Sequence, residues 1–455
     1  MQRLHTTANG LAAASPVAPA SRGAESRCHV EQTRYRGWNA FKLANGLVTL
    51  YVVPDIGGRV IQFLLADHPF FFVNPDLAGK VSPPEENGGA LGGWKNYGGS
   101  KLWPAPQGWE SDEQWPGPPD ALLDGGRYHG EITKQEPTHV AVTVTSPPDL
   151  RTGIQFSRTV NLFAGSTQVR HDCVMKNISR RPVRWAVWEV SQLDTADPQD
   201  PTRFNPDFWA FCPLNPRSAH PKGFWPMFGQ VTHPSYRPDY ERGLLAVKYD
   251  YRVGKVGLDS AAGWLACVNG LSDHCFVGRF TPFPGAPYPD GAAVEFWLNG
   301  AGEFILNGLA ITNAADPKQT PYFMEAEILS PLVELAPGDE CRFEINWFAA
   351  RCPRPVVEMT SAGPVSQPLR LTRNGGQARL EGVFGVFCPG RAAAVFKAAD
   401  GKELGRADLG AVGPTKVFRL AKQCRLPSNT FRVTVIAADA EGQLRGVLGN
   451  AAIPE

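Results

Sequence analysis

Glycine and proline interrupt this chain along its whole length, with 47 glycines and 41 prolines among 455 residues. Both residues break helices and supply the turns that many short strands need. Between these turns the side chains alternate with a period of two. In one segment Ile154, Phe156, Arg158, Val160 and Leu162 share a face, and the other face carries only Gln, Ser, Thr and Asn. With no convincing long amphipathic helix and no repeat of blade length, the pattern predicts an all-β protein built on a large antiparallel sandwich.

The aromatic residues divide the chain into two parts. All twelve tryptophans lie between Trp38 and Trp347, and the final hundred residues contain neither Trp nor Tyr. A Pro-, Gly- and Ser-rich stretch marks the boundary, and short β runs follow it. The predicted parts are a disordered leader over residues 1–30, the large sandwich over 31–352, a linker over 353–367, and a small β-sandwich over 368–455.

Charge and cysteine usage exclude several classes of function. Lys and Arg total 45 against 44 Asp and Glu, so the chain lacks the basic excess that binds nucleic acid or anionic lipid. No apolar run reaches the roughly 20 residues of a membrane-spanning helix. The nine cysteines are scattered without a C-x-x-C pair, and no nucleotide or flavin motif is present. We therefore expect no metal, no cofactor, and a cytoplasmic location in preference to a periplasmic or secreted one.

A tryptophan-rich loop is the most informative stretch for function. Trp94, Trp103, Trp109 and Trp115 fall in a segment rich in Gly and Pro, where indoles are seldom needed for stability alone. Flat aromatic rings stack on the apolar faces of sugar rings, and nearby Lys101 and Gln107 have polar ends for hydroxyl groups. The segment therefore predicts a carbohydrate site. The alternative is that the indoles cap the edge of the sandwich core.

Four segments resemble the galactose mutarotase-like superfamily, which includes the aldose 1-epimerases and an uncharacterised bacterial branch. They are residues 53–60, which end in Gly-Gly-Arg-Val and include Arg59; residues 98–104, Gly-Gly-Ser-Lys-Leu-Trp-Pro; residues 128–131, Tyr-His-Gly-Glu; and residues 325–331, Glu-Ala-Glu-Ile-Leu-Ser-Pro. The resemblance covers roughly residues 36–350. It implies a β-supersandwich with a sugar-sized groove.

The resemblance also implies acid and base roles. In aldose epimerases a carboxylate removes the proton of the anomeric hydroxyl while a histidine protonates the ring oxygen. Glu327 matches the base, and Glu325 lies on the same strand face because side chains alternate along a strand. The segment 185–194 departs from the family because it contains no histidine, so His129 becomes the expected acid. The plainer readings are a structural ion pair for Glu327 and an ordinary surface position for His129.

The segment 185–194 leaves two orientations open. If one face points into the groove, Trp188 stacks on the ligand and Gln192 binds a hydroxyl. If the other face does, Glu189 is a possible acid. The sequence does not decide between these orientations.

The leading prediction is therefore a protein that binds a sugar or oligosaccharide in an aromatic groove and acts on it by epimerase-type acid and base chemistry. One alternative is a binding protein without catalysis. Another is a polysaccharide lyase that uses Tyr128, His129, Lys101 and Arg127. The predicted catalytic residues are Glu327 and His129, and the predicted substrate-binding residues are Arg59, Lys101, Trp103, Gln107, Trp109, Trp188, Glu189, Gln192 and Glu325.

Overall fold

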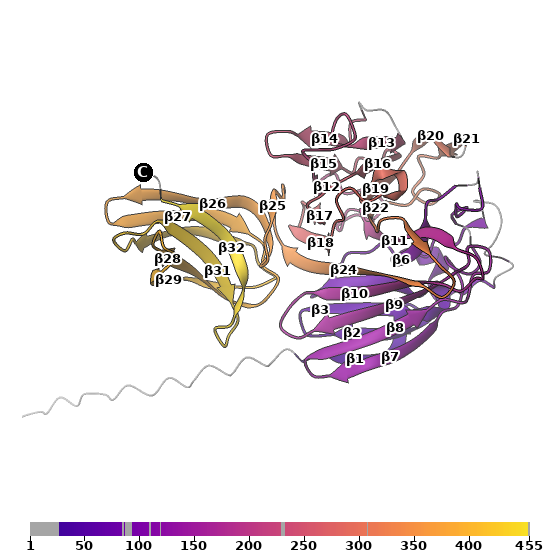
Figure 1. Cartoon of the computed structure of the whole chain (residues 1–455), viewed down its shortest axis with the longest axis horizontal. Coiled ribbons are helices and arrows are strands. Elements are labelled where there is room, and N and C mark those ends of the chain that lie inside the picture. Colours follow the sequence, from indigo (N-terminus) through magenta and orange to yellow (C-terminus); the bar gives the residue numbers. More distant parts are fainter. Residues whose placement is uncertain are drawn as a thin grey trace, which may run out of the picture.

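The structure is a computed structural model in which two large antiparallel sheets face each other, with a smaller sandwich at the C-terminal end (Figure 1). The predicted fold class is confirmed. The described residues are 27–83, 86, 93–108, 111–118, 120–228, 233–306 and 308–453. The leader predicted over residues 1–30 therefore falls almost entirely outside the described residues. Within the described part no helix is both long and apolar enough to cross a membrane.

The first large sheet has twelve strands and carries the candidate site. Its strands are β1 (His29–Tyr35), β2 (Trp38–Ala44), β3 (Val48–Val53), β4 (Arg59–Leu65), β5 (His68–Pro69), β6 (Ser100–Ala105), β11 (Val183–Asp194), β13 (Trp225–Phe228), β16 (Gly254–Leu258), β19 (Val294–Asn299), β22 (Phe323–Leu329) and β23 (Val333–Leu335). Their order is β1-β2-β3-β4-β6-β11-β22-β19-β16-β13, with β5 paired to β4 and β23 paired to β11. Strands far apart in the sequence, such as β6, β11 and β22, thus become direct neighbours.

The second large sheet has ten strands and covers one face of the first. Its strands are β7 (His129–Glu136), β8 (His139–Thr145), β9 (Ile154–Phe163), β10 (Val169–Asn177), β12 (Phe208–Pro213), β14 (Tyr236–Asp239), β15 (Leu244–Lys248), β17 (Trp264–Asn269), β18 (His274–Phe280) and β24 (Glu340–Arg351). Their order is β14-β15-β12-β17-β18-β24-β10-β9-β8-β7. A separate hairpin joins β20 (Gly302–Leu306) to β21 (Leu309–Asn313).

The core between the sheets follows from the predicted alternation. On β9 the residues Ile154, Phe156, Val160 and Leu162 are fully buried, as the period of two requires. Aromatic rings from both sheets meet in this layer; the rings of Phe63 on β4 and Trp347 on β24 lie 5.9 Å apart. The helical elements among the described residues are short 3-10 turns: η1 (Pro54–Ile56), η2 (Pro75–Leu77) and η5 (Pro289–Gly291).

The C-terminal sandwich consists of two four-stranded sheets, β25-β26-β27-β30 and β29-β28-β31-β32. Its strands are β25 (Glu358–Met359), β26 (Pro364–Asn374), β27 (Gln377–Phe384), β28 (Gly390–Lys397), β29 (Glu403–Val412), β30 (Phe418–Arg425), β31 (Arg432–Ala438) and β32 (Leu444–Ala452). Its first strands thus begin inside the segment predicted as a linker.

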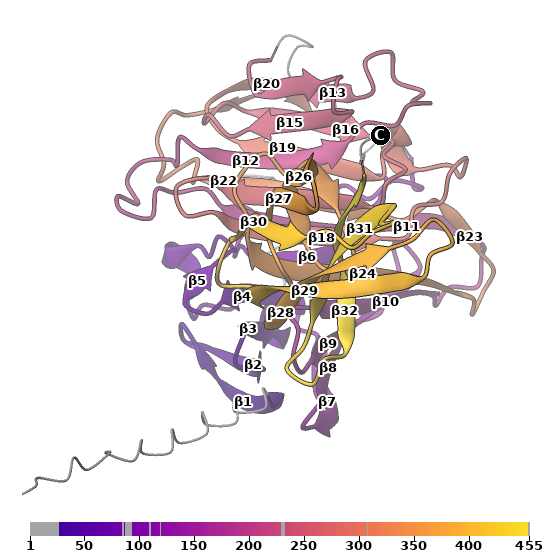
Figure 2. The ribbon, with the colours of Figure 1, turned by 90° about the vertical axis from the view of Figure 1, so that its left-hand side faces the viewer.

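This segment is ordered because it packs against the large domain. Val356 belongs to a buried apolar cluster that includes residues of the ten-stranded sheet. In the same cluster the rings of Phe348 and Phe387 stack at 4.3 Å across the junction. Figure 2 shows the C-terminal strands in front of the large sheets.

Candidate functional site

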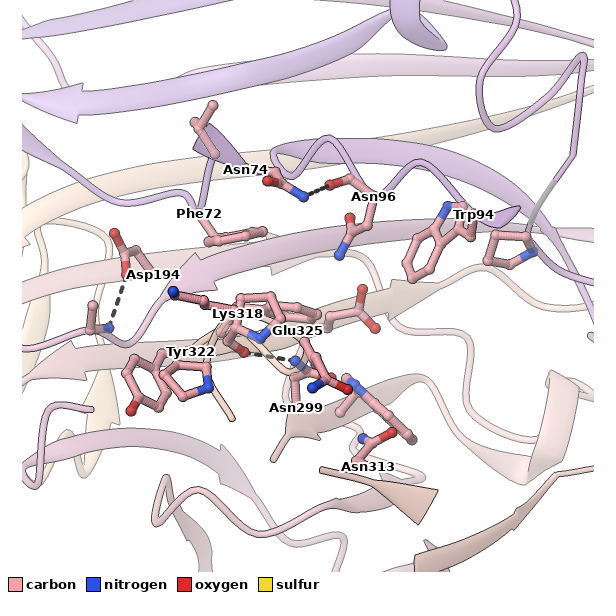
Figure 3. A pocket seen from close by; sticks show the side chains of 18 of the residues that line it. Phe72, Asn74, Trp94, Asn96, Asp194, Asn299, Asn313, Lys318, Tyr322 and Glu325 are labelled. Carbon is pink, nitrogen blue, oxygen red and sulfur yellow. Dashed lines mark hydrogen bonds between the residues drawn. The ribbon is translucent and has the colours of Figure 1, made fainter. Parts of the chain in front are cut away.

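A pocket of about 1250 Å³ opens on the face of the twelve-stranded sheet that is turned away from the ten-stranded sheet. This volume exceeds the roughly 300–1,000 Å³ typical of sites for drug-sized ligands. Figure 3 shows side chains from several strands and loops converging on it. Its wall is strongly aromatic, and the rings that line it are Phe72, Trp94, Trp103, Trp188, Phe228, Trp297, Phe304, Tyr322 and Phe323.

Strand register brings the functional groups of the floor into rows. Lys255 on β16 pairs with Trp297 on β19, Trp297 pairs with Glu325 on β22, and Glu325 pairs with Gln192 on β11. Side chains of directly paired residues project from the same face of a sheet. Four strands that are distant in the sequence therefore present one row of side chains toward the pocket.

Glu325 is the carboxylate of this row that reaches the pocket. It lines the cavity although only 8% of the residue is exposed. Its Oε1 accepts hydrogen bonds from Lys101 Nζ at 3.1 Å and from Gln192 Nε2 at 2.8 Å. Its Oε2 has no hydrogen-bond partner among the described residues. Lys101 is fully buried, and burial lowers the pKa of its ammonium. Two buried donors thus hold one carboxylate oxygen and leave the other without a hydrogen bond among the described residues.

Glu327 lies one layer deeper than the sequence led us to expect. It is 0% exposed and does not line the pocket. Its Oε2 accepts hydrogen bonds from Trp188 Nε1 at 2.7 Å and from Lys255 Nζ at 3.2 Å, and burial raises the pKa of its carboxyl. The Trp188 indole and Lys255, which both line the pocket, lie between Glu327 and the cavity. Glu325 is the carboxylate of this strand that lines the pocket.

Two residues that contact or adjoin Glu327, namely Lys255 and Glu295, were missed by the sequence reasoning. Lys255 lines the pocket, lies 4.6 Å above the Trp188 ring, and forms an ion pair of 2.7 Å with Glu295 Oε2. Glu295 is buried beside Glu327, its direct partner on the neighbouring strand. The available signal was one charged residue in the middle of each apolar strand, in Gly-Lys-Val-Gly-Leu and Val-Glu-Phe-Trp-Leu-Asn.

Asp124 anchors the indoles from the predicted loop. It accepts hydrogen bonds from Trp94 Nε1 at 2.8 Å and from Trp103 Nε1 at 3.2 Å. Arg59, which is 0% exposed, donates to the same carboxylate at 2.6 Å. The structure thus places Arg59 behind the aromatic wall, where it supports the wall without reaching the cavity. Trp115 is fully buried and belongs to the core, as the plainer reading of the loop proposed.

The two orientations left open for the segment 185–194 are now resolved. Trp188 and Gln192 project to the pocket side, where Trp188 lines the cavity and Gln192 holds Glu325. Glu189 projects into the sandwich interior, where its Oε1 accepts hydrogen bonds from the hydroxyls of Ser100 and Ser191, both at 2.6 Å. The expectation that Glu189 binds substrate is therefore not met, because alternation places it on the opposite face.

The expected acid, His129, is not brought to the pocket. It is exposed at the start of β7, an edge strand of the other large sheet, and does not line the cavity. Arg127 pairs with Asp55 at 2.8 Å, and the buried Tyr128 hydroxyl donates to the carbonyl of Leu123. The residues proposed for a lyase therefore do not assemble around the pocket.

The remaining predicted ligand contacts have different outcomes. Trp103 and Gln107 line the pocket, and Lys101 supports it from below. Trp109 lies outside the described residues. Among the described residues no group of three or more His, Cys, Asp or Glu is arranged to hold a metal ion.

Comparisons with known proteins give one partial family match and several distant structural similarities. A family model described as "Domain of unknown function (DUF4380)" matches residues 39–199, less than half of the chain. No curated protein matches. Similar solved structures include a galactose mutarotase-like protein from Lactobacillus casei, with 10% identity, a TM-score of 0.43, and coverage of 68% of this chain and 99% of that one.

Two further solved structures are similar. A putative aldose 1-epimerase from Klebsiella pneumoniae has 12% identity and a TM-score of 0.47, with coverage of 68% of this chain and 79% of that one. A TPR-domain containing protein from Parabacteroides distasonis has 12% identity and a TM-score of 0.46, with coverage of 71% of this chain; the match spans 48% of that protein's length.

Proposed function

We propose that this protein binds a carbohydrate in the aromatic pocket and that Glu325 acts on it as the base of an epimerase-type reaction. One observation carries the proposal: four indoles and a carboxylate oxygen without a described partner converge on a single cavity. The indoles are those of Trp94, Trp103, Trp188 and Trp297.

The polar lining suits a ligand with many hydroxyl groups. Asn74, Asn96, Asn299, Asn313 and Gln107 all line the pocket. Each amide has both donor and acceptor atoms, so it pairs with a hydroxyl in either direction. Apolar ring faces for stacking, with a few polar groups to fix orientation, are the combination expected of a ligand site. This combination supports a sugar over a purely apolar ligand.

The chemistry follows from the way Glu325 is held. Lys101 and Gln192 both bind Oε1, which fixes the carboxylate and leaves Oε2 to accept a proton from a sugar hydroxyl. Removal of the proton of the anomeric hydroxyl opens the ring to an aldehyde when the ring oxygen receives a proton at the same time. Ring closure on the other face of the carbonyl then gives the opposite anomer.

The test measures binding and exchange separately. Tryptophan fluorescence titration with D-glucose, D-galactose, D-mannose and maltotriose reports binding, and two-dimensional exchange NMR reports anomer interconversion of the same sugars. We expect Glu325→Gln to bind within a few-fold of wild type and to lose about 100-fold or more in exchange rate. The control is Glu131→Gln, an exposed carboxylate on β7 that does not line the pocket. Absence of binding for every sugar would remove the proposal.

A carbohydrate-binding protein without catalysis is the second candidate. The observation in its favour is that no histidine occurs among the described residues lining the pocket. It predicts fluorescence changes on adding sugar with anomer exchange no faster than in buffer.

A further inference from the structure

The cluster beneath the pocket contains two carboxyl groups and one ammonium, those of Glu295, Glu327 and Lys255. Lys255 Nζ lies 2.7 Å from Glu295 Oε2 and 3.2 Å from Glu327 Oε2, and both carboxyl groups are at most 1% exposed. One ammonium balances only one of two carboxylates. A second buried negative charge is costly, so the carboxyl pair keeps a proton instead. Burial accordingly raises the pKa of Glu295 and of Glu327.

The carboxyl pair also has unused hydrogen-bonding capacity. Glu295 Oε1 and Glu327 Oε1 are both buried without a hydrogen-bond partner. The two residues are direct partners across β19 and β22, so their side chains project from the sheet side by side. A proton held by either carboxyl group therefore has a second carboxyl group next to it and the Lys255 nitrogen within hydrogen-bond distance.

Lys255 is the member of this cluster that reaches the ligand cavity. It lines the pocket with 8% of its surface exposed, whereas Glu295 and Glu327 do not line it. Lys255 and Glu325 occupy the same row, separated by Trp297, so a ring stacked on that indole has one group on either side. This arrangement places a proton acceptor and a proton donor at opposite ends of one short platform.

We propose that Lys255 is the proton donor of the pocket and that the Glu295–Glu327 pair behind it replaces the proton it gives up, an inference that rests on the function proposed above. Lys255 thereby takes the role for which the sequence suggested His129.

The step balances without an outside reactant. Glu325 takes the anomeric hydroxyl proton, and the electrons of that O–H bond form the carbonyl. The bond between the anomeric carbon and the ring oxygen breaks, and its electron pair goes to the ring oxygen, which takes a proton from the Lys255 ammonium. The protonated carboxyl group of the pair then passes its proton to the Lys255 amine. Ring closure reverses every transfer.

Asp194 is the competing proton donor in the lining, and the test must separate it from Lys255. Burial raises the pKa of Asp194 to about 6, and its Oδ1 accepts a hydrogen bond from the Ala196 amide. Figure 3 shows Asp194 on the Tyr322 side of the pocket, apart from Glu325. An acid in that place does not share the Trp297 platform with the base.

The experiment uses the same four sugars, with fluorescence for binding and exchange NMR from pH 5 to pH 9. We expect Lys255→Met to lower anomer exchange about 100-fold and Glu295→Gln about 10-fold, with binding unchanged within a few-fold. Glu325 and Asp290 are the other charged groups that act on this cluster, and both remain in these variants. In the wild type we expect the exchange rate to fall at alkaline pH, because the carboxyl pair then loses its stored proton. Glu295→Gln should remove this fall. A purely structural ion pair would change stability without moving the pH profile.

Glu189→Gln is the matched control, since Glu189 is an equally buried carboxylate on the interior face of the same sheet. It should leave the pH profile unchanged, and Asp194→Asn should lower the exchange rate much less than Lys255→Met does. Exchange at the wild-type rate in Glu295→Gln and Lys255→Met overturns the inference, as does a large loss in Asp194→Asn alone. Binding without exchange in the wild type also overturns it but leaves sugar binding intact. Absence of binding instead defeats the proposed function.

Discussion

Two buried polar clusters lie on opposite faces of the twelve-stranded sheet and differ in the number of carboxyl groups that each cation faces. In the interior cluster, Arg158 donates to Ser100 Oγ at 3.1 Å, and Ser100 donates to Glu189 at 2.6 Å. One cation there balances one carboxylate. In the pocket cluster, one cation faces two carboxylates, and each carboxylate keeps an unpartnered oxygen. Burial alone therefore does not distinguish the two clusters, whereas a surplus of carboxyl groups over cations next to a cavity does.

Breaking the interior cluster should have the largest effect on stability. Arg158→Met leaves Glu189 buried without its cation, which typically costs about 3–5 kcal/mol. The midpoint of guanidinium unfolding of the full chain measures this loss. The double variant with Glu189→Gln should recover part of it, because the uncompensated charge is then gone. A loss below about 1 kcal/mol in the single variant would mean that the interior cluster is not balanced by Arg158.

Removing the cation of the pocket cluster should lower the free energy of unfolding by less than Arg158→Met does. The size of this loss should depend on pH. Lys255→Met removes charged hydrogen bonds, each worth about 1.5–3 kcal/mol, but a carboxyl pair that already keeps a proton limits the damage. Because the folded-state pKa values of Glu295 and Glu327 are raised, the folded protein binds more protons than the unfolded chain above pH 4.5, and stability falls as pH rises.

Without the ammonium this fall should steepen, so the loss in Lys255→Met should be greater at pH 8 than at pH 5. Unfolding curves at the two pH values provide the measurement. Glu295→Gln should flatten the dependence seen in the wild type, because one of the two titrating carboxyl groups is removed. An equal loss at both pH values would contradict the unbalanced-charge description.

Removing one neutral donor to the pocket cluster is a smaller perturbation. Trp188→Phe keeps an aromatic wall but deletes the Nε1–H that donates to Glu327 Oε2 at 2.7 Å. We expect a loss of about 1 kcal/mol of unfolding free energy and a several-fold weaker sugar affinity. Denaturant unfolding and fluorescence titration measure the two effects. Unchanged affinity would argue that the ligand does not stack on this indole.

The smallest effect is expected for predicted site residues that belong to neither cluster in the structure. His129→Ala and Arg127→Ala change exposed side chains outside the pocket, so sugar binding and anomer exchange should stay at wild-type values. The same titrations check this. A drop in binding for either variant would show that the ligand extends well beyond the cavity described here.

The strands were predictable from the sequence because alternation is a local property. The periodic segment beginning at Ile154 became β9, and Glu325 and Glu327 do share a strand face. Local pattern does not say which face meets the second sheet, so the role of Glu189 stayed open. Local pattern also does not say how far a side chain lies below the pocket surface. For Glu327 this is set by Trp188 and Lys255, which pack over it from other strands.

Two features of the site depend on the pairing of strands that are distant in the sequence, so they could not be predicted from the sequence. Lys255 and Glu295 come together only because β16 and β19 are neighbours. His129 stands in a motif that resembles the family's His-Gly loop, but its strand, β7, lies in the other sheet. Topology, more than residue type, separates the groups around the pocket from those outside it.

The alternation of β11 gives this strand an unusual intolerance of length changes. Trp188 and Gln192 project toward the pocket, whereas Glu189 projects into the sandwich interior. Pairing with β22 and β6 fixes the register of β11 on both sides. Deleting or inserting one codon upstream of Trp188 would exchange the two sets of side chains, which point substitutions never do. We therefore expect natural or engineered variants of this protein to place their indels in the surrounding loops and to spare this strand.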